Sequence, residues 1–169
     1  MQLLGTMLLA GGAALLGITA AHRTQWRVRD LRMLTEGLRM MLRELSYRLA
    51  PLPELLRSAE EGSEGCVKHF FDLCAQGADG LDGRTFHSIW RQSMQDSKLC
   101  LASEERHCLD SLGAVLGRYD SDNQLQALNI AINRLDELRG QAEEQSKRLG
   151  KLYSVLGLTA GAFLMILLV

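Results

Sequence analysis

Two long stretches without a charged side chain, one near each end, constrain the fold of this sequence most strongly. Residues 3–21 and 152–169 contain no Asp, Glu, Lys or Arg. As α-helices they would extend about 29 Å and about 27 Å, close to the hydrocarbon thickness of a bilayer. The sequence therefore predicts a transmembrane helix over residues 1–22, a second over residues 151–169, and a separate domain over residues 23–150.

The basic residues beside these stretches all lie on the side of the middle domain. They are Arg23, Arg27, Arg29 and Arg32 after the first stretch and Lys147, Arg148 and Lys151 before the second. Because Lys and Arg favour the cytoplasmic side of membrane helices, we expect the middle domain to be cytoplasmic. A cleaved signal peptide is the alternative for the first stretch, but no Lys or Arg precedes it.

Small residues recur at a spacing of four in both apolar stretches. Gly17 lies between Ala13 and Ala21 in the first, and Gly157 and Gly161 lie in the second. This spacing allows two helices to approach closely in a membrane, although Gly and Ala are common in membrane helices in any case. Gly17, Gly157 and Gly161 are therefore our candidates for helix packing.

Apolar residues recur every three or four positions through the middle domain, which predicts an all-α fold. The first helical pattern includes Leu31, Leu34, Leu38, Met41 or Leu42, Leu45 and Leu49, and Pro51-Leu52-Pro53 ends it. Shorter helices are expected from this turn to Gly62, from Ser63-Glu64 to about Gly77, around Phe86–Met94 and from Ser103 to Gly117. A last pattern runs from Asp120 or Ser121 directly into the second apolar stretch.

Within these helices the sequence separates an apolar core from a charged surface. Val67, Phe70, Phe71, Cys74 and Trp90 are expected to point inward. Ser103 is expected to cap its helix, and Glu104-Glu105 and Glu143-Glu144 are expected to be solvated surface.

Composition excludes several classes of function. A net charge of −1 and a pI of about 6.4 provide no basic field for binding nucleic acid. The sequence GAVLGR at residues 113–118 lacks the Lys-Ser/Thr ending of a phosphate-binding loop, so we do not expect nucleotide hydrolysis. The acidic turn at residues 79–83 lacks the ligand spacing of a calcium loop.

The cysteines and histidines are candidates for a metal site or a catalytic pair. The residues are Cys66, His69, Cys74, Cys100, His107 and Cys108. In a straight helix Cys66 and Cys74 would be about 12 Å apart, too far to bind one ion, and no flanking motif activates a nucleophile. We therefore expect no catalytic residue, metal or cofactor, and interpret these cysteines as reduced thiols.

The chain resembles the stage III sporulation protein AB family of endospore-forming bacteria. The resemblance is carried by Glu44 and Tyr47, Pro51-Leu52-Pro53-Glu54, Phe70, Trp90, Leu112-Gly113, Leu116-Gly117, Asp120, Gln124, Lys151-Leu152-Tyr153, Leu156-Gly157 and Gly161. It implies a six-helix domain similar to those of the inner-membrane platform proteins of type II secretion and type IV pilus systems. It also implies a location in the mother-cell membrane around the forespore.

The function implied by this resemblance is a non-enzymatic component of the channel between mother cell and forespore. Such a component would act as a platform beside a cytoplasmic ATPase, stage III sporulation protein AA, and beside other membrane proteins, with a homo-oligomer as a further option. The candidate partner-binding residues are Pro51, Pro53, Glu54, Trp90, Asp120 and Gln124. Two alternatives stay open: a membrane-anchored metal-binding protein or enzyme using the Cys and His residues, and a signalling adaptor with a hinge at Gly150.

Overall fold

The computed structural model describes the backbone of residues 2–80, 83–118 and 120–168, and the side chains of residues 24–80, 83–118, 120–148 and 150. Within these ranges every regular element is an α-helix and no strand occurs. The helices are α1 (Gln2–Arg48), α2 (Leu52–Glu61), α3 (Gly65–Asp79), α4 (Phe86–Asp96), α5 (Ser103–Val115) and α6 (Ser121–Leu168). The predicted all-α fold is confirmed.

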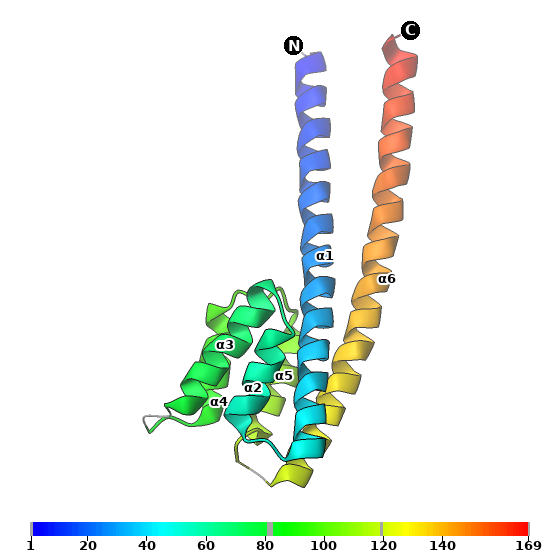
Figure 1. Cartoon of the computed structure of the whole chain (residues 1–169). Coiled ribbons are helices and arrows are strands. Elements are labelled where there is room, and N and C mark those ends of the chain that lie inside the picture. Colours follow the sequence, from blue (N-terminus) through cyan, green and yellow to red (C-terminus); the bar gives the residue numbers. More distant parts are fainter. Residues whose placement is uncertain (1, 81–82, 119, 169) are drawn as a thin grey trace. The chain divides into compact units, whose positions relative to one another are not determined.

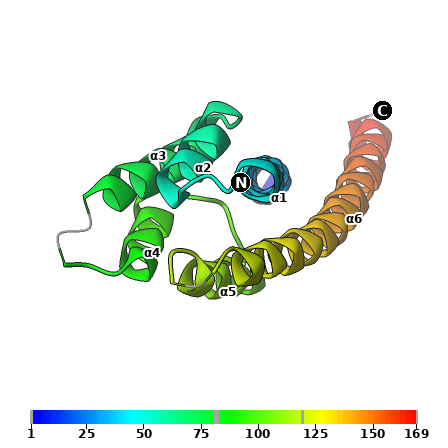
Figure 2. The ribbon, with the colours of Figure 1, turned by 60° about the horizontal axis from the view of Figure 1, so that its bottom comes forward.

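The chain divides into two compact units, each considered by itself. One unit, Arg27–Gly140, is the helical bundle, and the segments on either side of it form the other. In the bundle, α2 packs on α3, α3 on α4 and α4 on α5. Figures 1 and 2 show these four helices gathered beside the part of α1 that belongs to the bundle.

The two apolar stretches belong to the outer parts of α1 and α6, whose backbone is helical throughout. Their side chains lie outside the described residues, and so does the predicted packing of Gly17, Gly157 and Gly161. Among the residues that the structure describes, no helix is both long enough and apolar enough to cross a bilayer.

The core of the bundle follows the predicted apolar spacing. Leu31, Leu34, Leu38, Met41 and Leu45 of α1 are all at most 3% exposed. In α6, Leu128, Ile132, Leu135 and Leu138 are buried at the same three- and four-residue steps. Since a fully buried Leu contributes about 1.5 to 3 kcal/mol, these two stripes account for much of the attachment of the long helices to the bundle.

Aromatic rings fill the centre of the bundle. Trp90 meets Phe70 edge-on, with ring centroids 4.8 Å apart, and lies 5.8 Å from the ring of Phe86. Phe71 packs beside Phe70 at 5.2 Å. The predicted inward orientation of Phe70, Phe71 and Trp90 is confirmed, since all three are 0% exposed.

Glycines allow these rings to lie close to the neighbouring backbone. A Cβ added at Gly37 would come within 2.6 Å of the Phe71 ring, and one added at Gly113 would overlap the Trp90 indole. Gly77 likewise leaves room for Ile89. The expected helix end at Gly77 is therefore wrong: α3 continues through this close contact to Asp79, and Gly80 follows as its C-cap.

Helix starts differ in detail from the predicted caps. Pro51 precedes α2, and its carbonyl oxygen accepts from the N–H of Glu54 at 2.9 Å. Ser63 does not open α3; its hydroxyl donates back to the Ala59 carbonyl oxygen at 2.7 Å, and the helix begins at Gly65. Ser103 is not the cap of α5 either, because Ala102 holds that position.

The prediction that Glu104-Glu105 is solvated surface is wrong for Glu105. Its carboxylate is 0% exposed, accepts from the Ala102 N–H at 2.6 Å and pairs with Arg27, whose Nε lies 2.8 Å away. Glu104 is exposed, as expected for solvated surface. Glu105 thus supplies the capping interaction that Ser103 does not, and ties α5 to α1.

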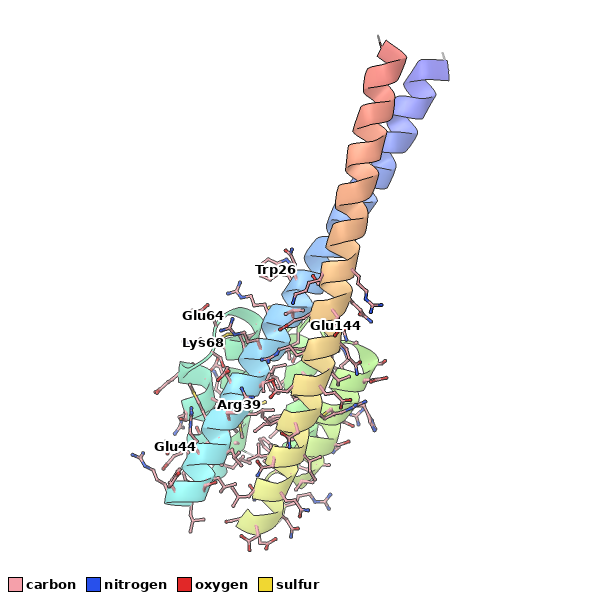
Figure 3. All side chains as sticks on the ribbon, turned by 90° about the vertical axis from the view of Figure 1, so that its right-hand side faces the viewer. Trp26, Arg39, Glu44, Glu64, Lys68 and Glu144 are labelled. Carbon is pink, nitrogen blue, oxygen red and sulfur yellow. The ribbon has the colours of Figure 1, made fainter. Side chains whose placement is uncertain are left out.

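Two further polar contacts join distant segments of the bundle. Asp30, 7% exposed, accepts from the Cys100 N–H at 2.9 Å, which holds the segment before α5 against α1. Arg39, labelled in Figure 3 on the part of α1 that runs beside α6, pairs with Asp136. An ion pair therefore links α1 and α6 in addition to their buried apolar residues.

Candidate partner-binding surfaces

One end of the bundle brings together two loops that are distant in sequence. The α1–α2 connection and the α5–α6 connection lie at the same end, at the bottom of Figure 1. Gly117, with φ +78°, lies against α2: a Cβ added there would be 3.1 Å from Cδ2 of Leu52. We call the exposed rim formed by Pro51–Glu54 and Asp120–Gln124 the end surface.

Five of the six candidate partner-binding residues lie on this end surface. Pro51, Glu54 and Asp120 are exposed, and Pro53 and Gln124 are half-buried. The end surface thus brings together candidate residues from two stretches that are separate in the sequence.

The three acidic residues of the end surface, Glu54, Asp120 and Asp122, all lie at helix starts. Glu54 lies in the first turn of α2, where a carboxylate is favoured by the helix dipole. Asp120 precedes α6: its carbonyl oxygen accepts from the Gln124 N–H at 3.1 Å and its side chain accepts from the Asn123 amide at 2.5 Å. The Asn123 amide therefore holds the exposed carboxylate of Asp120, and the carboxylate of Glu54 is exposed as well.

Trp90, the sixth candidate, lies elsewhere. It is 0% exposed, and its indole N–H donates to the Leu109 carbonyl oxygen at 2.8 Å. A wholly buried side chain cannot contact a partner directly, so the structure gives Trp90 a place in the core and not on a binding surface.

An apolar groove runs between α5 and α6. Its volume is about 610 Å³, and it is lined by Leu112 and Val115 of α5 and by Ala127, Ile130 and Ala131 of α6, among others. A smaller hollow of about 240 Å³ continues it toward the start of α6 and shares Val115, Ala127 and Ile130. Ile130 is 62% exposed. We call the two hollows together the α5–α6 groove.

The other end of the groove is polar. Glu104, His107, Cys108 and Arg134 line it, and Arg134 pairs with Glu104 at 3.3 Å. Burial raises the pKa of the Cys108 thiol, so this cysteine is a poor nucleophile where it lies.

Two large apolar side chains project at the C-terminal end of α1. Tyr47 is 86% exposed and Leu49 is 67% exposed. The sequence placed Leu49 on the inward stripe of this helix, which is wrong: α1 ends at Arg48, and Leu49 follows with φ +49°. Pro51 could have indicated that the helix ends before Leu49, because a proline disfavours helix in the segment that precedes it.

The cysteines and histidines do not converge on one site. Cys66 is exposed whereas Cys74, on the same helix, is buried, and burial raises the pKa of the Cys74 thiol to about 12. Cys66 and Cys74 therefore differ in their surroundings, one at the surface of α3 and the other in the core. Within the part of the chain that the structure describes, no three His, Cys, Asp or Glu residues are close enough to hold a metal ion.

A polar cluster between α4 and α5 was not expected from the sequence. Asp110 lies 3.0 Å from Nε2 of His87 and 3.3 Å from Nε of Arg91. Arg106 and His107 line the shallow pocket beside it. No spacing within one helix could have indicated this cluster, because its members come from two elements.

Known proteins resemble this chain both in sequence and in fold. The sequence matches the family model of stage III sporulation protein AB over residues 2–169. Stage III sporulation protein AB of Bacillus subtilis (strain 168) is 24% identical over 174 residues, which cover 99% of each chain. A solved structure of a stage III sporulation protein AB has a TM-score of 0.65 at 22% identity, and the match covers 72% of this chain and 97% of that chain. The bundle thus has a known fold, and the chain belongs to the stage III sporulation protein AB family.

Proposed function

We propose that this chain is a non-enzymatic membrane component of the channel between mother cell and forespore, where it acts as a platform that couples a cytoplasmic ATPase to channel assembly. The observation that carries the proposal is the end surface, on which two distant segments present solvent-facing carboxylates. Family membership supports the context of sporulation.

The proposed location follows from the charge pattern of the sequence. Two charge-free stretches, residues 3–21 and 152–169, are long enough to be membrane helices, and the neighbouring Lys and Arg residues lie between them. In this arrangement the bundle is cytoplasmic and its end surface is accessible to a soluble partner. The proposed partner is stage III sporulation protein AA, with other membrane proteins of the complex beside the apolar stretches.

The end surface is suited to contact with a protein. Its acidic side chains offer acceptors for the Arg and Lys residues of a partner, and the rigid prolines lose little conformational entropy on binding. A polar, exposed surface of this kind is typical of a regulated contact rather than of a permanent one.

The test is co-purification of the ATPase with the full chain from membranes of sporulating cells. We expect capture of the ATPase by the wild type and its loss in a variant with Glu54→Lys and Asp120→Lys. Glu61→Lys, at the other end of α2, is the control, since Glu61 is also exposed and carries the same charge. If the double variant still captured the ATPase, the end surface would not be the binding site. If the wild type failed to capture the ATPase, the proposed coupling would be contradicted.

A further inference from the structure

A polar pocket between α4 and α5 is not used by the proposed function, and we call it the α4–α5 pocket. Its volume is about 250 Å³. The side chains that line it are Arg91, Met94, Gln95, Arg106, His107 and Asp110. We propose that the α4–α5 pocket binds the phosphate group of a small molecule, held between an arginine of each helix. This goes beyond the proposed function, because the pocket shares no residue with the end surface and needs no other protein.

The arginine of α5, Arg106, is held at the pocket by uncharged partners. Its Nε donates to the Leu101 carbonyl oxygen at 3.2 Å, and its Nη2 donates to the Leu99 carbonyl oxygen at 3.3 Å. These bonds orient the guanidinium, but a carbonyl oxygen does not cancel its positive charge. A guanidinium has five N–H donors, so donors remain for a ligand. Arg106 is therefore an oriented cation at the wall of the pocket.

The arginine of α4, Arg91, supplies a second cation. Its Nε lies 3.3 Å from Oδ1 of Asp110, and the same oxygen lies 3.0 Å from Nε2 of His87. Asp110 thus holds Arg91 through Nε and leaves the two Nη groups of the guanidinium for a ligand. The charged residues that line the pocket are two arginines and one aspartate, so the lining has a positive excess.

The charges just outside the lining do not reverse this excess. At the end of α4, the exposed Asp96 is followed two positions later by the exposed Lys98, of opposite charge. Glu104 pairs with Arg134 of α6 and lines the α5–α6 groove instead. Glu105, the other carboxylate in the first turn of α5, is buried in its pair with α1. The pocket therefore attracts an anion.

The donors of the pocket suit a phosphate group. Gln95 and His107 add N–H groups to those of the two arginines, so four side chains from two helices can donate. A phosphate group has at least three strong acceptor oxygens, whereas a carboxylate has two, and arginine binds phosphate through paired hydrogen bonds. Because the pocket is shallow, the rest of a larger molecule such as a nucleotide could extend into solvent.

The ring NMR signals of the histidines test the pocket in the full chain in detergent. His107 lines the pocket, whereas His69 is exposed on α3 and is an internal control. Inorganic phosphate is added at constant pH and ionic strength, with chloride as the balancing anion. We expect the His107 signal to shift until it saturates and the His69 signal to stay unchanged. AMP is then added in place of phosphate: tighter binding would identify a nucleotide as the source of the phosphate group, and weaker binding would identify free phosphate.

Arg91→Gln separates binding from folding. Arg91 is 59% exposed and its ion pair lies at the surface, so the variant should melt at nearly the wild-type temperature. Loss of a charged donor should weaken phosphate binding by about tenfold or more. Arg57→Gln is the matched control, because Arg57 is 54% exposed and also pairs with a carboxylate, that of Asp79. It should leave phosphate binding unchanged.

Three results would overturn the proposal. The first is the absence of a saturable shift of His107 with both phosphate and AMP. The second is an equal shift with acetate at the same ionic strength, which would mean that the pocket suits a carboxylate, such as an acidic side chain of a protein, equally well. The third is phosphate binding that Arg91→Gln weakens no more than Arg57→Gln does. None of these measurements involves the ATPase, so failure here is distinguishable from failure of the proposed function.

Discussion

The indole of Trp90 occupies the space that a side chain at Gly113 would need. A Cβ added at Gly113 would overlap Cδ1 and Cγ of the ring, while the indole N–H donates to the Leu109 carbonyl oxygen one turn earlier in α5. Gly113 therefore sets the distance between α4 and α5, and Trp90 connects that contact to Phe70 in α3.

Gly113→Ala is expected to destabilise the protein although alanine favours helix. The added methyl group forces the buried indole to move, and overpacking of this kind costs about 1 to 3 kcal/mol. Gly140→Ala is the matched control, since Gly140 is also helical but has nothing within 4 Å of an added Cβ. It should stabilise by about 0.5 to 1 kcal/mol. Denaturant unfolding measures both, and equal effects would contradict the Trp90–Gly113 contact.

Trp90 itself is expected to dominate the aromatic core. Trp90→Ala should lower the free energy of unfolding by about 3 to 5 kcal/mol, because it leaves a cavity among Phe70 and Phe86. Trp90→Phe keeps an aromatic ring but loses the hydrogen bond to Leu109, so a smaller loss is expected. Thermal melting followed by circular dichroism distinguishes the two, and an unchanged melting temperature for Trp90→Ala would show that the indole is not in the core.

Glu105 is expected to matter more than its exposed neighbour Glu104. Glu105→Ala removes the partner of Arg27 and the acceptor of the Ala102 N–H. We expect a loss of about 2 to 3 kcal/mol, below the usual range for a broken buried pair, because Arg27 is 25% exposed and can still reach water. Glu104→Ala, which breaks an exposed pair with Arg134, should change stability by less than about 1 kcal/mol. Similar losses for the two variants would rule out the buried pair.

Asp30 gives a prediction about pH. Burial raises the pKa of its carboxyl above the ordinary 3.8, against the opposing effects of the Cys100 N–H and Arg29. The folded state therefore holds the proton more tightly than the unfolded state. The contribution of Asp30 to stability is full below 3.8 and is lost as the pH rises through the folded-state pKa.

Asp30→Asn has no charge to desolvate and keeps an oxygen for the Cys100 N–H. We expect it to match the wild type at pH well below 3.8 and to be more stable than the wild type at neutral pH. Urea unfolding at both pH values measures the difference. A variant that is less stable at neutral pH would mean that the ionised carboxylate is the form that holds Cys100.

The helices could be predicted from sequence because the relevant signals are local. The three- and four-residue spacing of Leu31, Leu34 and Leu38 identifies a buried stripe without any knowledge of its neighbours. Pro51 similarly marks the turn before α2. The predicted caps were wrong: Ser63 and Ser103 are typical cap residues, but the Ser63 hydroxyl donates back to the Ala59 carbonyl oxygen, and Glu105 accepts from the N–H of the actual cap, Ala102.

The contacts between helices could not be predicted, because they join residues far apart in the chain. Glu105 looks like surface in sequence, and only its contact with Arg27, 78 positions earlier, explains why it is buried. The end surface was predicted as separate residues, and the approach of Gly117 to Leu52 brought them together. The α5–α6 groove and the projecting Tyr47 and Leu49 were missed, since exposure of an apolar side chain depends on where its helix ends.

The central claim is that the bundle lies on the cytoplasmic side of the membrane, and Cys66 is a suitable probe for it. Cys66 is exposed on α3, whereas Cys74 is buried with its thiol pKa raised to about 12 and should react only after unfolding. Intact cells that make the full chain are treated with a membrane-impermeant maleimide, before and after permeabilisation. The account predicts that Cys66 is labelled only after permeabilisation. Labelling of Cys66 in sealed cells would place the bundle outside and contradict the proposed platform for a cytoplasmic ATPase.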